Sequence, residues 1–237
     1  MKKTTIHVAG INFEIVHQYD QNARFRGFTT DSEPSMSFMV NEDDIEAELS
    51  ANQNLFARDY LEFISIYRKI AEVLPCFDAF VMHGAVISKD NRSYVFTAPG
   101  GTGKTTHIQL WRKCFPDCWI LNGDKPIIRK HNGIFYACGT PWKGKELLGT
   151  NRNKRIQSIC FLKRSPDNRI DRLLPTDAVD SLMQQVYLSK EPDHLATLLS
   201  LIDELLQTVP FFTLHCNMEQ SAAQTAYRAL SDVERRK

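Results

Sequence analysis

The sequence of 237 residues lacks the features that would assign it to a membrane or secreted class. No apolar run approaches the roughly 18 residues that a membrane-spanning helix needs, and the opening MKKTTIHVAGINFEI has no apolar stretch behind its two lysines. The formal net charge is only +1, so no global attraction to nucleic acid or to an anionic membrane is expected. We therefore expect a cytoplasmic protein with neither a nucleic-acid nor a membrane partner.

The six cysteines also lack a recognisable arrangement. Only Cys114 and Cys118 lie close together, in CFPDC, and no second pair completes the set of about four ligands that a structural zinc site requires. In a reducing compartment these cysteines are expected to remain thiols. We interpret them as small buried hydrophobic residues, with metal binding as the alternative.

The composition is that of a globular protein, with 43% hydrophobic and 24% charged residues and no repeat or low-complexity segment. To about Val40, IHVAGINFEIV and SMSFMV alternate apolar and polar residues, which predicts a small β-rich region, followed by a turn or short helix in NEDDIEAEL. We place this N-terminal region at residues 1–54 and a larger domain of the α/β class at residues 55–237.

Helical spacing and short apolar runs alternate in the larger region. Residues 54–74 predict an amphipathic helix that Pro75 ends, and helices are also expected at 104–115, 177–187, 193–208 and 221–234. Strands are expected in FVMHGAVIS, SYVFTA, CWILNGD, PIIRK, GIFYACGT, SICFLKR and FFTLHC, with HNG as a hairpin turn. This alternation indicates a mixed sheet with helices.

One segment, APGGTGKT from Ala98 to Thr105, fits the phosphate-binding pattern G-x-x-x-x-G-K-[ST] except that Ala98 replaces the first glycine. Backbone N–H groups of such a loop point at phosphate oxygens, the lysine reaches the β and γ phosphates, and the hydroxyl binds Mg²⁺. A solvated lysine is the alternative, but a cation at a helix N-terminus opposes the helix dipole unless an anion lies beside it. The nucleotide-binding residues we expect are Pro99, Gly100, Gly101, Thr102, Gly103, Lys104, Thr105 and Thr106.

Phosphoryl transfer also needs a metal ligand and a group that orients or deprotonates the nucleophile. Asp124 is the first candidate because it follows a strand, and ligands of open α/β sheets collect at the carboxyl ends of strands; a turn-forming aspartate is the alternative. Thr105 would bind the metal directly. His83 is either a catalytic residue or a hydrogen-bonded core histidine, and Glu146 either a third metal ligand or an exposed loop residue.

A basic segment, NRNKR at residues 151–155, has two interpretations. Its side chains form either a solvated loop or a clamp for phosphate or an acidic substrate. We expect the acceptor surface to involve this segment or the β-rich region before Asn41.

Together these motifs resemble a known family. HG before a strand, then GTGKT, then an aspartate at the end of the next strand resembles the catalytic domain of HPr kinase/phosphorylase and related P-loop serine kinases, whose fold is shared with phosphoenolpyruvate carboxykinase. GTPWKGKE, NKRIQSICFLKR and FFTLHCNMEQSAAQTAYRAL are similar to small HPr-kinase-like proteins found beside bacterial peptide-modification genes. The resemblance runs from about Leu55 to the end.

The resemblance implies roles for four residues. Lys104 becomes the γ-phosphate ligand, Thr105 a Mg²⁺ ligand, Asp124 the general base or a metal-linked acid, and His83 a residue that faces the γ-phosphate. The bifunctional enzyme has two neighbouring acids, whereas here Lys125 follows Asp124. Only one acidic role can be filled there, which favours kinase over phosphorylase activity.

The sequence thus predicts a kinase that uses Mg²⁺ and ATP to phosphorylate a serine-type hydroxyl of a peptide or protein. Two alternatives stay open: a kinase for a small hydroxyl compound, and an ATP-binding regulatory module without catalysis. The sequence indicates neither the oligomeric state nor the acceptor.

Overall fold

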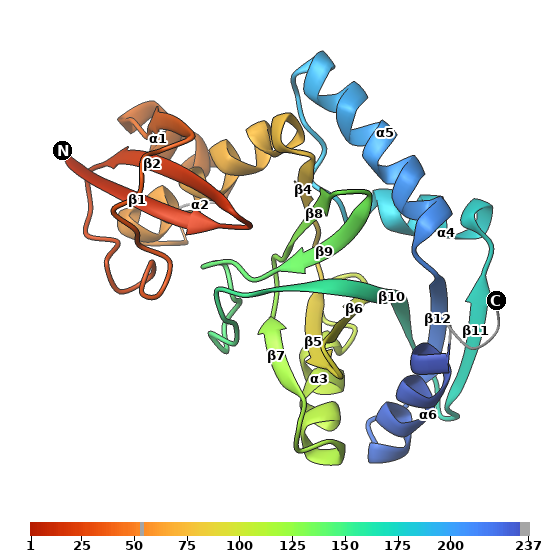
Figure 1. Ribbon diagram of the computed structural model, residues 1–237. Helices are drawn as coiled ribbons and strands as arrows, with labels where there is room; N and C mark the ends of the chain where they lie inside the picture. Colours follow the sequence, from red (N-terminus) through yellow and green to blue (C-terminus); the bar gives the residue numbers. More distant parts are fainter. Residues whose placement is uncertain (53–54, 233–237) are drawn as a thin grey trace.

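A computed structural model describes residues 1–52 and 55–232 of the chain. It has a small three-stranded N-terminal sheet and a larger, curled, nine-stranded mixed sheet with helices packed on both faces (Figure 1). The predicted α/β class with a small β-rich region in front of it is confirmed.

The N-terminal sheet is built from β1 (Lys2–Val8), β2 (Ile11–His17) and β3 (Met36–Met39). β1 and β2 form a tight antiparallel hairpin because Ala9 and Gly10 both adopt positive φ, as a two-residue turn requires. Every second residue of β2 is buried, which is the alternation that the sequence predicted.

Two helices cover this sheet, α1 (Glu42–Ala51) and α2 (Arg58–Val73). Asn41 begins α1 with a capping box, since its side chain accepts from the N–H of Asp44, whose carboxylate accepts from the N–H of Asn41. The apolar face of α2 lies in the same hydrophobic cluster as β1 and β2. The boundary that we predicted between residues 54 and 55 stays a prediction; residues 53 and 54 lie outside the described residues.

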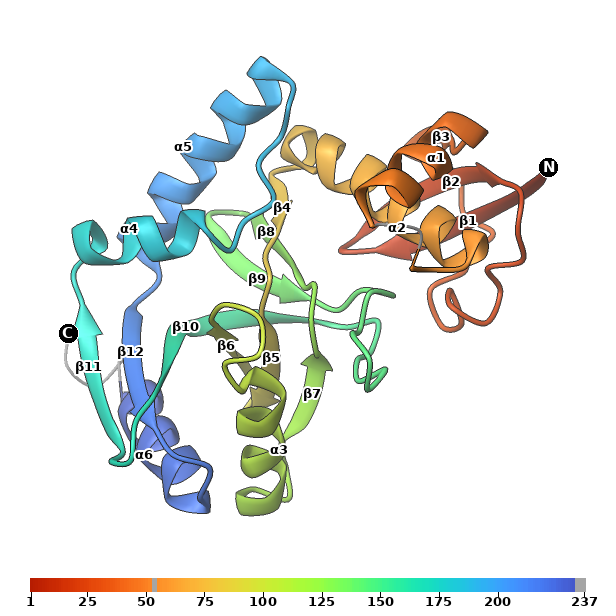
Figure 2. The ribbon, with the colours of Figure 1, turned by 180° about the vertical axis from the view of Figure 1, so that it is seen from behind.

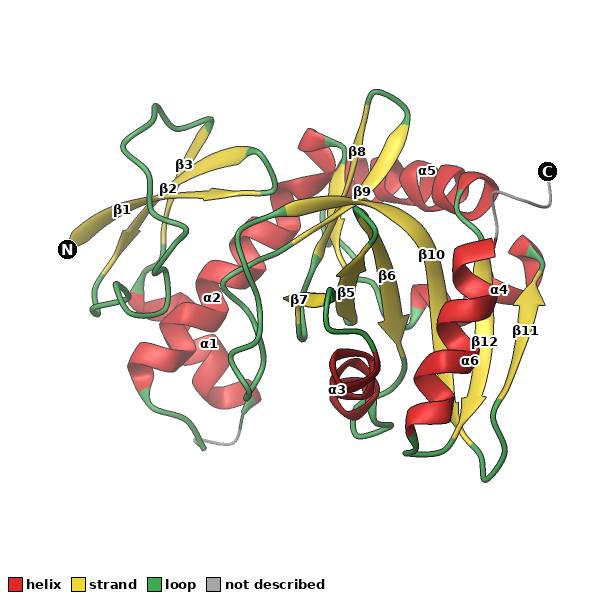
Figure 3. Cartoon of the chain, turned by 60° about the horizontal axis from the view of Figure 1, so that its bottom comes forward, coloured by secondary structure: helices red, strands yellow, loops and turns green. Residues whose placement is uncertain are grey.

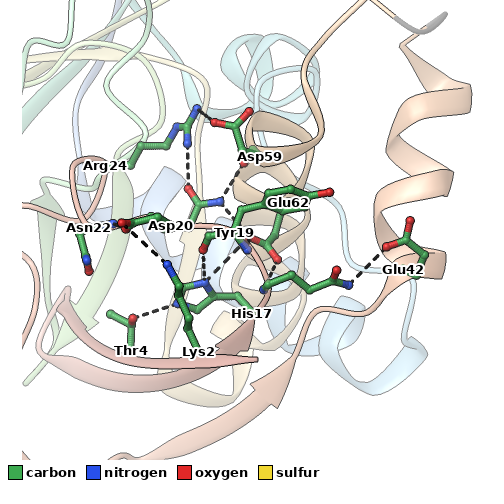
Figure 4. A network of polar contacts seen from close by, with 12 residues as sticks. Lys2, Thr4, His17, Tyr19, Asp20, Asn22, Arg24, Glu42, Asp59 and Glu62 are labelled. Atoms are coloured by element: carbon green, nitrogen blue, oxygen red, sulfur yellow. Dashed lines mark hydrogen bonds and ion pairs between the residues drawn. The ribbon is translucent and has the colours of Figure 1, made fainter.

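A buried carboxylate fixes the N-terminal sheet to α2 (Figure 4). Glu62 is fully buried, and it accepts hydrogen bonds from the N–H of Gln18 (2.5 Å), the N–H of Tyr19 (3.0 Å) and the side-chain amide of Gln21 (2.9 Å). Three donors compensate the desolvation of the charge. The segment after β2 is therefore held against α2 by polar contacts as well as by apolar packing.

The larger sheet has the strand order β4-β8-β9-β10-β6-β5-β7, and β12 pairs with both β10 and β11. After the short 3₁₀ helix η1 (Leu74–Phe77), the first strands are β4 (Ala79–Val81), β5 (Ala85–Lys89), β6 (Arg92–Thr97) and β7 (Trp119–Asn122). The remaining strands are β8 (Ile127–His131), β9 (Ile134–Cys138), β10 (Asn153–Arg164), β11 (Arg169–Leu173) and β12 (Phe211–Cys216).

Each face of this sheet has its own pair of helices. α3 (Lys104–Cys114) and α6 (Gln220–Ser231) lie side by side in one apolar cluster (Figure 3). α4 (Pro175–Met183) and α5 (Pro192–Thr208) belong to the cluster on the other face. Figure 2 shows the chain from behind, where β6 turns into α3. The turn from β6 into α3 is the phosphate-type segment of the sequence.

Most of the predicted elements are confirmed, including the hairpin between β8 and β9, whose Asn132 and Gly133 have positive φ. The last residues of the helix predicted at 221–234 lie outside the described residues.

The predicted helix 177–187 is too long, because α4 ends at Met183 and Val186 instead forms a bridge with Met82. β11 was not predicted, and β10 begins at Asn153, so the basic segment is half strand rather than a loop.

FVMHGAVIS is not one strand, as we predicted, but two, β4 and β5, separated by Met82–Gly84. A side chain at Gly84 would place its Cβ 3.2 Å from the C=O of Phe96, so the backbones approach closely there. The break places His83 between two strands instead of within one.

Two further expectations concern location and cysteines. Within residues 1–52 and 55–232, every helix is too short or too polar to cross a membrane. All six cysteines are free thiols. Cys118, Cys138 and Cys160 are buried, as we expected of small hydrophobic residues, whereas Cys114 and Cys216 are half-buried and Cys76 is exposed, so the expectation is wrong for Cys76.

Candidate functional site

The phosphate-type loop connects β6 to α3. Thr97 ends the strand, and α3 begins at Lys104 with Gly103 as its N-cap residue. Gly101 has φ +75° and Gly103 has φ +120°, values that L-residues with side chains rarely adopt. The glycines therefore supply the backbone shape that curls the loop.

The concave side of this loop can accept an anion. Among the described residues, no hydrogen bond engages the N–H groups of Gly103, Lys104 or Thr105, and no side chain caps α3. A Cβ built on Gly100, Gly101 or Gly103 would meet nothing within 4 Å. Free N–H groups around open space at a helix N-terminus are the donors that a phosphate requires.

The Lys104 side chain folds back on the loop. Its ammonium donates to the C=O of Ala98 (2.8 Å) and of Pro99 (3.4 Å), and the residue is only 8% exposed. Burial lowers the pKa of Lys104 against the opposing field of the Asp124 carboxylate. A buried ammonium held only by neutral carbonyls is suited to receive a phosphate oxygen.

Arg164, at the end of β10, ties the loop to the neighbouring strand. Its guanidinium donates to the C=O of Gly101 and of Thr102, the latter at 3.2 Å. An open hollow of about 620 Å³ lies beside these contacts, within the range of about 300–1,000 Å³ typical of small-molecule pockets. It is lined by Gly100, Gly101, Thr102, Leu162, Lys163 and Arg164. Sequence analysis missed Arg164 because no local pattern links it to a loop some 60 residues earlier.

The structure brings His83 and Asp124 together: His83 Nε2 lies 3.5 Å from Asp124 Oδ1. The C=O of His83 accepts from the hydroxyl of Thr97 (2.7 Å), the last residue before the loop, and its N–H donates to the C=O of Gln185 (2.6 Å). The backbone of His83 is thus held to the last residue before the loop on one side and to the segment after α4 on the other.

His83 is neutral at physiological pH. Burial and then the ammonium groups of Lys125 and Lys104 lower the pKa of His83 to about 4, although the Asp124 carboxylate opposes them. A neutral imidazole can donate or accept a proton in a hydrogen bond without adding charge to the site.

Asp124 lies in a rigid turn at the end of β7. The side chain of Asn122 accepts from the N–H of Asp124 (3.0 Å) and of Lys125 (2.9 Å) while its amide donates to Thr140. Asn122 was not singled out from the sequence, although Asn before Gly-Asp is a turn signal that could have identified it. A Cβ on Gly144 would lie 3.1 Å from that of Asp124, so the segment after β9 packs directly against the aspartate.

The expected metal ligands are only partly assembled. Asp124 is half-buried, Thr105 lies in the first turn of α3, and Glu146 is exposed. In the described part of the chain, no group of three or more His, Cys, Asp or Glu side chains could hold a metal ion. Mg²⁺ needs only one or two protein oxygens when phosphates and waters complete its shell, so Thr105 and Asp124 suit it.

The basic segment does not reach the loop. β10 runs parallel to β6, and Ile156 lies opposite Ser93 near the start of β6, whereas Phe161 lies opposite Thr97 at the loop. Arg152 instead lies over the ring of Trp119 at 5.5 Å, and Lys154 bonds the side chain of Asn91. This register does not support a clamp for a loop-bound phosphate, and a clamp for an acidic substrate stays a prediction.

Comparison with known proteins adds little to this geometry. No protein-family model and no curated protein matches the chain. Among solved structures, it is similar to the Hpr(Ser) kinase/phosphatase from Coxiella burnetii, with 9% sequence identity and a TM-score of 0.39, over 65% of this chain and 98% of that one. A similarity of this size carries no weight for the site, whose chemistry rests on its own residues.

Proposed function

We propose that the protein is a Mg²⁺- and ATP-dependent kinase that transfers the γ-phosphoryl group to a serine-type hydroxyl of a peptide or protein. One observation carries the proposal: the phosphate-type loop, His83 and Asp124 lie at the same edge of the sheet, at the ends of three neighbouring strands. The loop follows β6, His83 precedes β5, and Asp124 follows β7, in the spatial order β6-β5-β7.

Each part of this edge has a distinct role. The free N–H groups of the loop and the Lys104 ammonium bind the phosphates and oppose their charge. Thr105 is the residue that would hold Mg²⁺ directly, and the metal when bound would neutralise charge on the β and γ phosphates. Asp124, the single acid at this position, is assigned to the proton and would hold the metal only in place of that role. Glu146, which is exposed, is kept as the proposed further metal ligand.

Asp124 accepts the proton that the acceptor hydroxyl loses during phosphoryl transfer. The acceptor oxygen forms a bond to the γ-phosphorus, the bond from that phosphorus to the β–γ bridging oxygen breaks, and ADP leaves with the electron pair. The hydroxyl proton passes to the Asp124 carboxylate. The neutral His83 imidazole, 3.5 Å away, orients that carboxylate.

A regulatory module that binds ATP without turnover is the second candidate. It is favoured by Lys125 in place of a second acid. A kinase for a small hydroxyl compound would use the same residues, so the identity of the labelled product distinguishes it.

The test follows the phosphoryl group. The purified protein is incubated with Mg²⁺ and γ-labelled ATP, alone and with peptides encoded beside it. We expect label on a serine hydroxyl; Lys104→Ala should weaken ATP binding, and Asp124→Asn should keep binding but lose about 10²–10⁴-fold in turnover. Asp180→Asn, an exposed aspartate on α4, is the matched control and should behave like the wild type.

Two other outcomes are decisive. ATP binding without any transfer, unchanged in Asp124→Asn, would support the regulatory module. No ATP binding by the wild type would reject both candidates.

A further inference from the structure

Lys125 occupies a fixed position beside the proposed catalytic residues. Its N–H donates to the Asn122 side chain (2.9 Å) and to the C=O of Trp142 (3.2 Å), and its C=O accepts from the Thr140 hydroxyl (2.7 Å). These three bonds use only the backbone of Lys125, so the side chain is free for another purpose.

The strand register places Lys125 opposite His83. β4 and β8 pair through Val81 and Ile127, and the same register continues past the strand ends, where the N–H of Gly84 donates to the C=O of Asp124 at 2.9 Å. In this register His83 faces Lys125, and directly opposed residues project from the same face of a sheet with their Cβ atoms about 4.5–5.5 Å apart. Lys125 is therefore an immediate neighbour of the imidazole.

The Lys125 ammonium makes no direct contact with an anion, and the Asp124 carboxylate, the preceding residue, favours its charge only from beyond ion-pair distance. Among the described residues, neither a hydrogen bond nor a carboxylate within ion-pair distance engages it, although the residue is only partly exposed. The nearby guanidinium of Arg68 is already paired with Glu48. A partly buried ammonium that no anion contacts directly is costly, even with the Asp124 carboxylate nearby, and an anion that binds to it reduces the cost.

The position of Lys125 indicates where that anion comes from. His83, before β5, lies between the loop that follows β6 and the turn that follows β7. Strands are about 4.8 Å apart, so the loop and Lys125 are separated by about 10 Å across the imidazole. An anion at Lys125 therefore lies across His83 from the loop-bound phosphates, on the side where the acceptor must enter.

We infer that Lys125 is a specificity-determining residue that binds an oxyanion, a carboxylate or a phosphate, carried by the phosphoryl acceptor next to its hydroxyl. This inference rests on the proposed kinase function. An anionic acceptor would be repelled by a second acid next to Asp124, and it would be attracted by the lysine that stands there instead. An ammonium acts as a point charge, so it selects for negative charge rather than for the shape of the anion.

The test uses inorganic phosphate and acetate as probes of the two anion types. Mg²⁺ and β,γ-imido-ATP first saturate the loop, and each probe is then titrated calorimetrically. We expect the wild type to bind one further anion, Lys125→Met to bind it at least about 10-fold more weakly, and Lys125→Arg to stay within about threefold. Lys145→Met, which removes an exposed lysine from the segment that packs beside Asp124, should equal the wild type.

Three results would overturn the inference: no second anion on the wild type, unchanged anion affinity in Lys125→Met, or an equal loss of imido-ATP affinity in that variant. The last result would assign Lys125 to the nucleotide phosphates. Thermal unfolding shows whether Lys125→Met is folded like the wild type. Lys125→Gln serves as a second neutral variant.

The inference can fail separately from the proposed function. If the wild type binds no imido-ATP, the kinase proposal is rejected, and phosphate is instead titrated into Lys104→Met, in which the loop lacks its cation. Phosphate binding that persists in Lys104→Met and disappears in the double variant with Lys125→Met supports an oxyanion site at Lys125. Equal phosphate binding by Lys104→Met and by the double variant would refute the oxyanion site at Lys125.

Discussion

The Lys104 ammonium donates a 2.8 Å hydrogen bond to the C=O of Ala98, the residue that stands where the phosphate-loop pattern has its first glycine. This bond uses the backbone of residue 98 and not its side chain, so alanine can replace glycine without loss of the contact. A bound phosphate must compete with this carbonyl for the ammonium.

Lys104→Met should separate binding from stability. Because the ammonium is buried without an ion-pair partner, its removal should leave the melting temperature unchanged or raised, while ATP affinity falls at least about 100-fold. Calorimetry of unfolding and of ATP binding measures both. A large loss of stability would show that the lysine is a structural residue.

Gly103→Ala should strain the loop. Residue 103 has φ +120°, and a side chain there costs about 1–3 kcal/mol. We expect Gly103→Ala to lower the free energy of unfolding by this amount and to weaken nucleotide binding. Gly100→Ala is the control for stability, because its backbone is not in the positive-φ region and a Cβ has open space. Equal denaturation curves for the two variants would contradict the assigned backbone strain.

Arg164→Ala should release the loop from β10. Without the guanidinium, the C=O groups of Gly101 and Thr102 lose their donor, so the hydrogen-bonded amides of Thr102 and His107 should exchange hydrogen faster. Because the loop is then less preorganised, ATP affinity should fall about 3- to 10-fold. Lys163→Ala, at the neighbouring residue, should leave the exchange rates unchanged because no bond from Lys163 to the loop is present among the described residues. Similar exchange in the two variants would rule out the tether.

Glu62→Gln should destabilise the N-terminal region. The amide replaces an acceptor by a donor that faces three N–H groups, which should cost about 2–3 kcal/mol in chemical denaturation. Glu42→Gln removes a carboxylate that is about half exposed and should cost no more than about 1 kcal/mol. If both substitutions cost the same, the buried network has no special stabilising role.

His107 should make stability depend on pH. Burial lowers the pKa of this imidazole, whose Nε2 accepts from the Trp111 indole at 3.0 Å, to about 3. The unfolded chain protonates histidine near pH 6.5, so the contribution of His107 is full above that pH and is lost progressively as the pH falls toward 3. Between pH 7.5 and pH 5, His107→Gln should remove about 2 kcal/mol of the pH dependence of unfolding. Parallel pH profiles for wild type and variant would contradict a buried neutral imidazole.

The loop and its helix could be predicted from the sequence because their signals are local. GTGKT and the helical spacing after it lie within twenty residues, and Asp124 follows a recognisable apolar strand. The alternation in β2 and the HNG turn between β8 and β9 could also be predicted, because these patterns are local as well.

The features that escaped prediction depend on distant contacts. The break at His83 follows from the approach of Gly84 to the backbone of Phe96, which no pattern in HGAVI reveals. β11 is a mostly exposed edge strand, RIDRL, whose partner β12 lies some 40 residues later. The contact of Arg164 with the loop and the register of Lys125 against His83 likewise arise only when separate strands meet.

The pairing of β10 also governs the order in which the protein can be completed during synthesis. This strand joins β6 on one side and β12 on the other, both parallel, and parallel neighbours cannot form as a local hairpin. β9 covers only Asn153–Arg155 on the edge of β10 that β12 joins. Until the ribosome has released Phe211–Cys216, Ile159–Arg164 on that edge therefore have no partner and expose their N–H and C=O groups to other chains. Chains that end before β12 should therefore aggregate, and a cell that makes this protein depends on the last strand to protect the first-built half of the sheet.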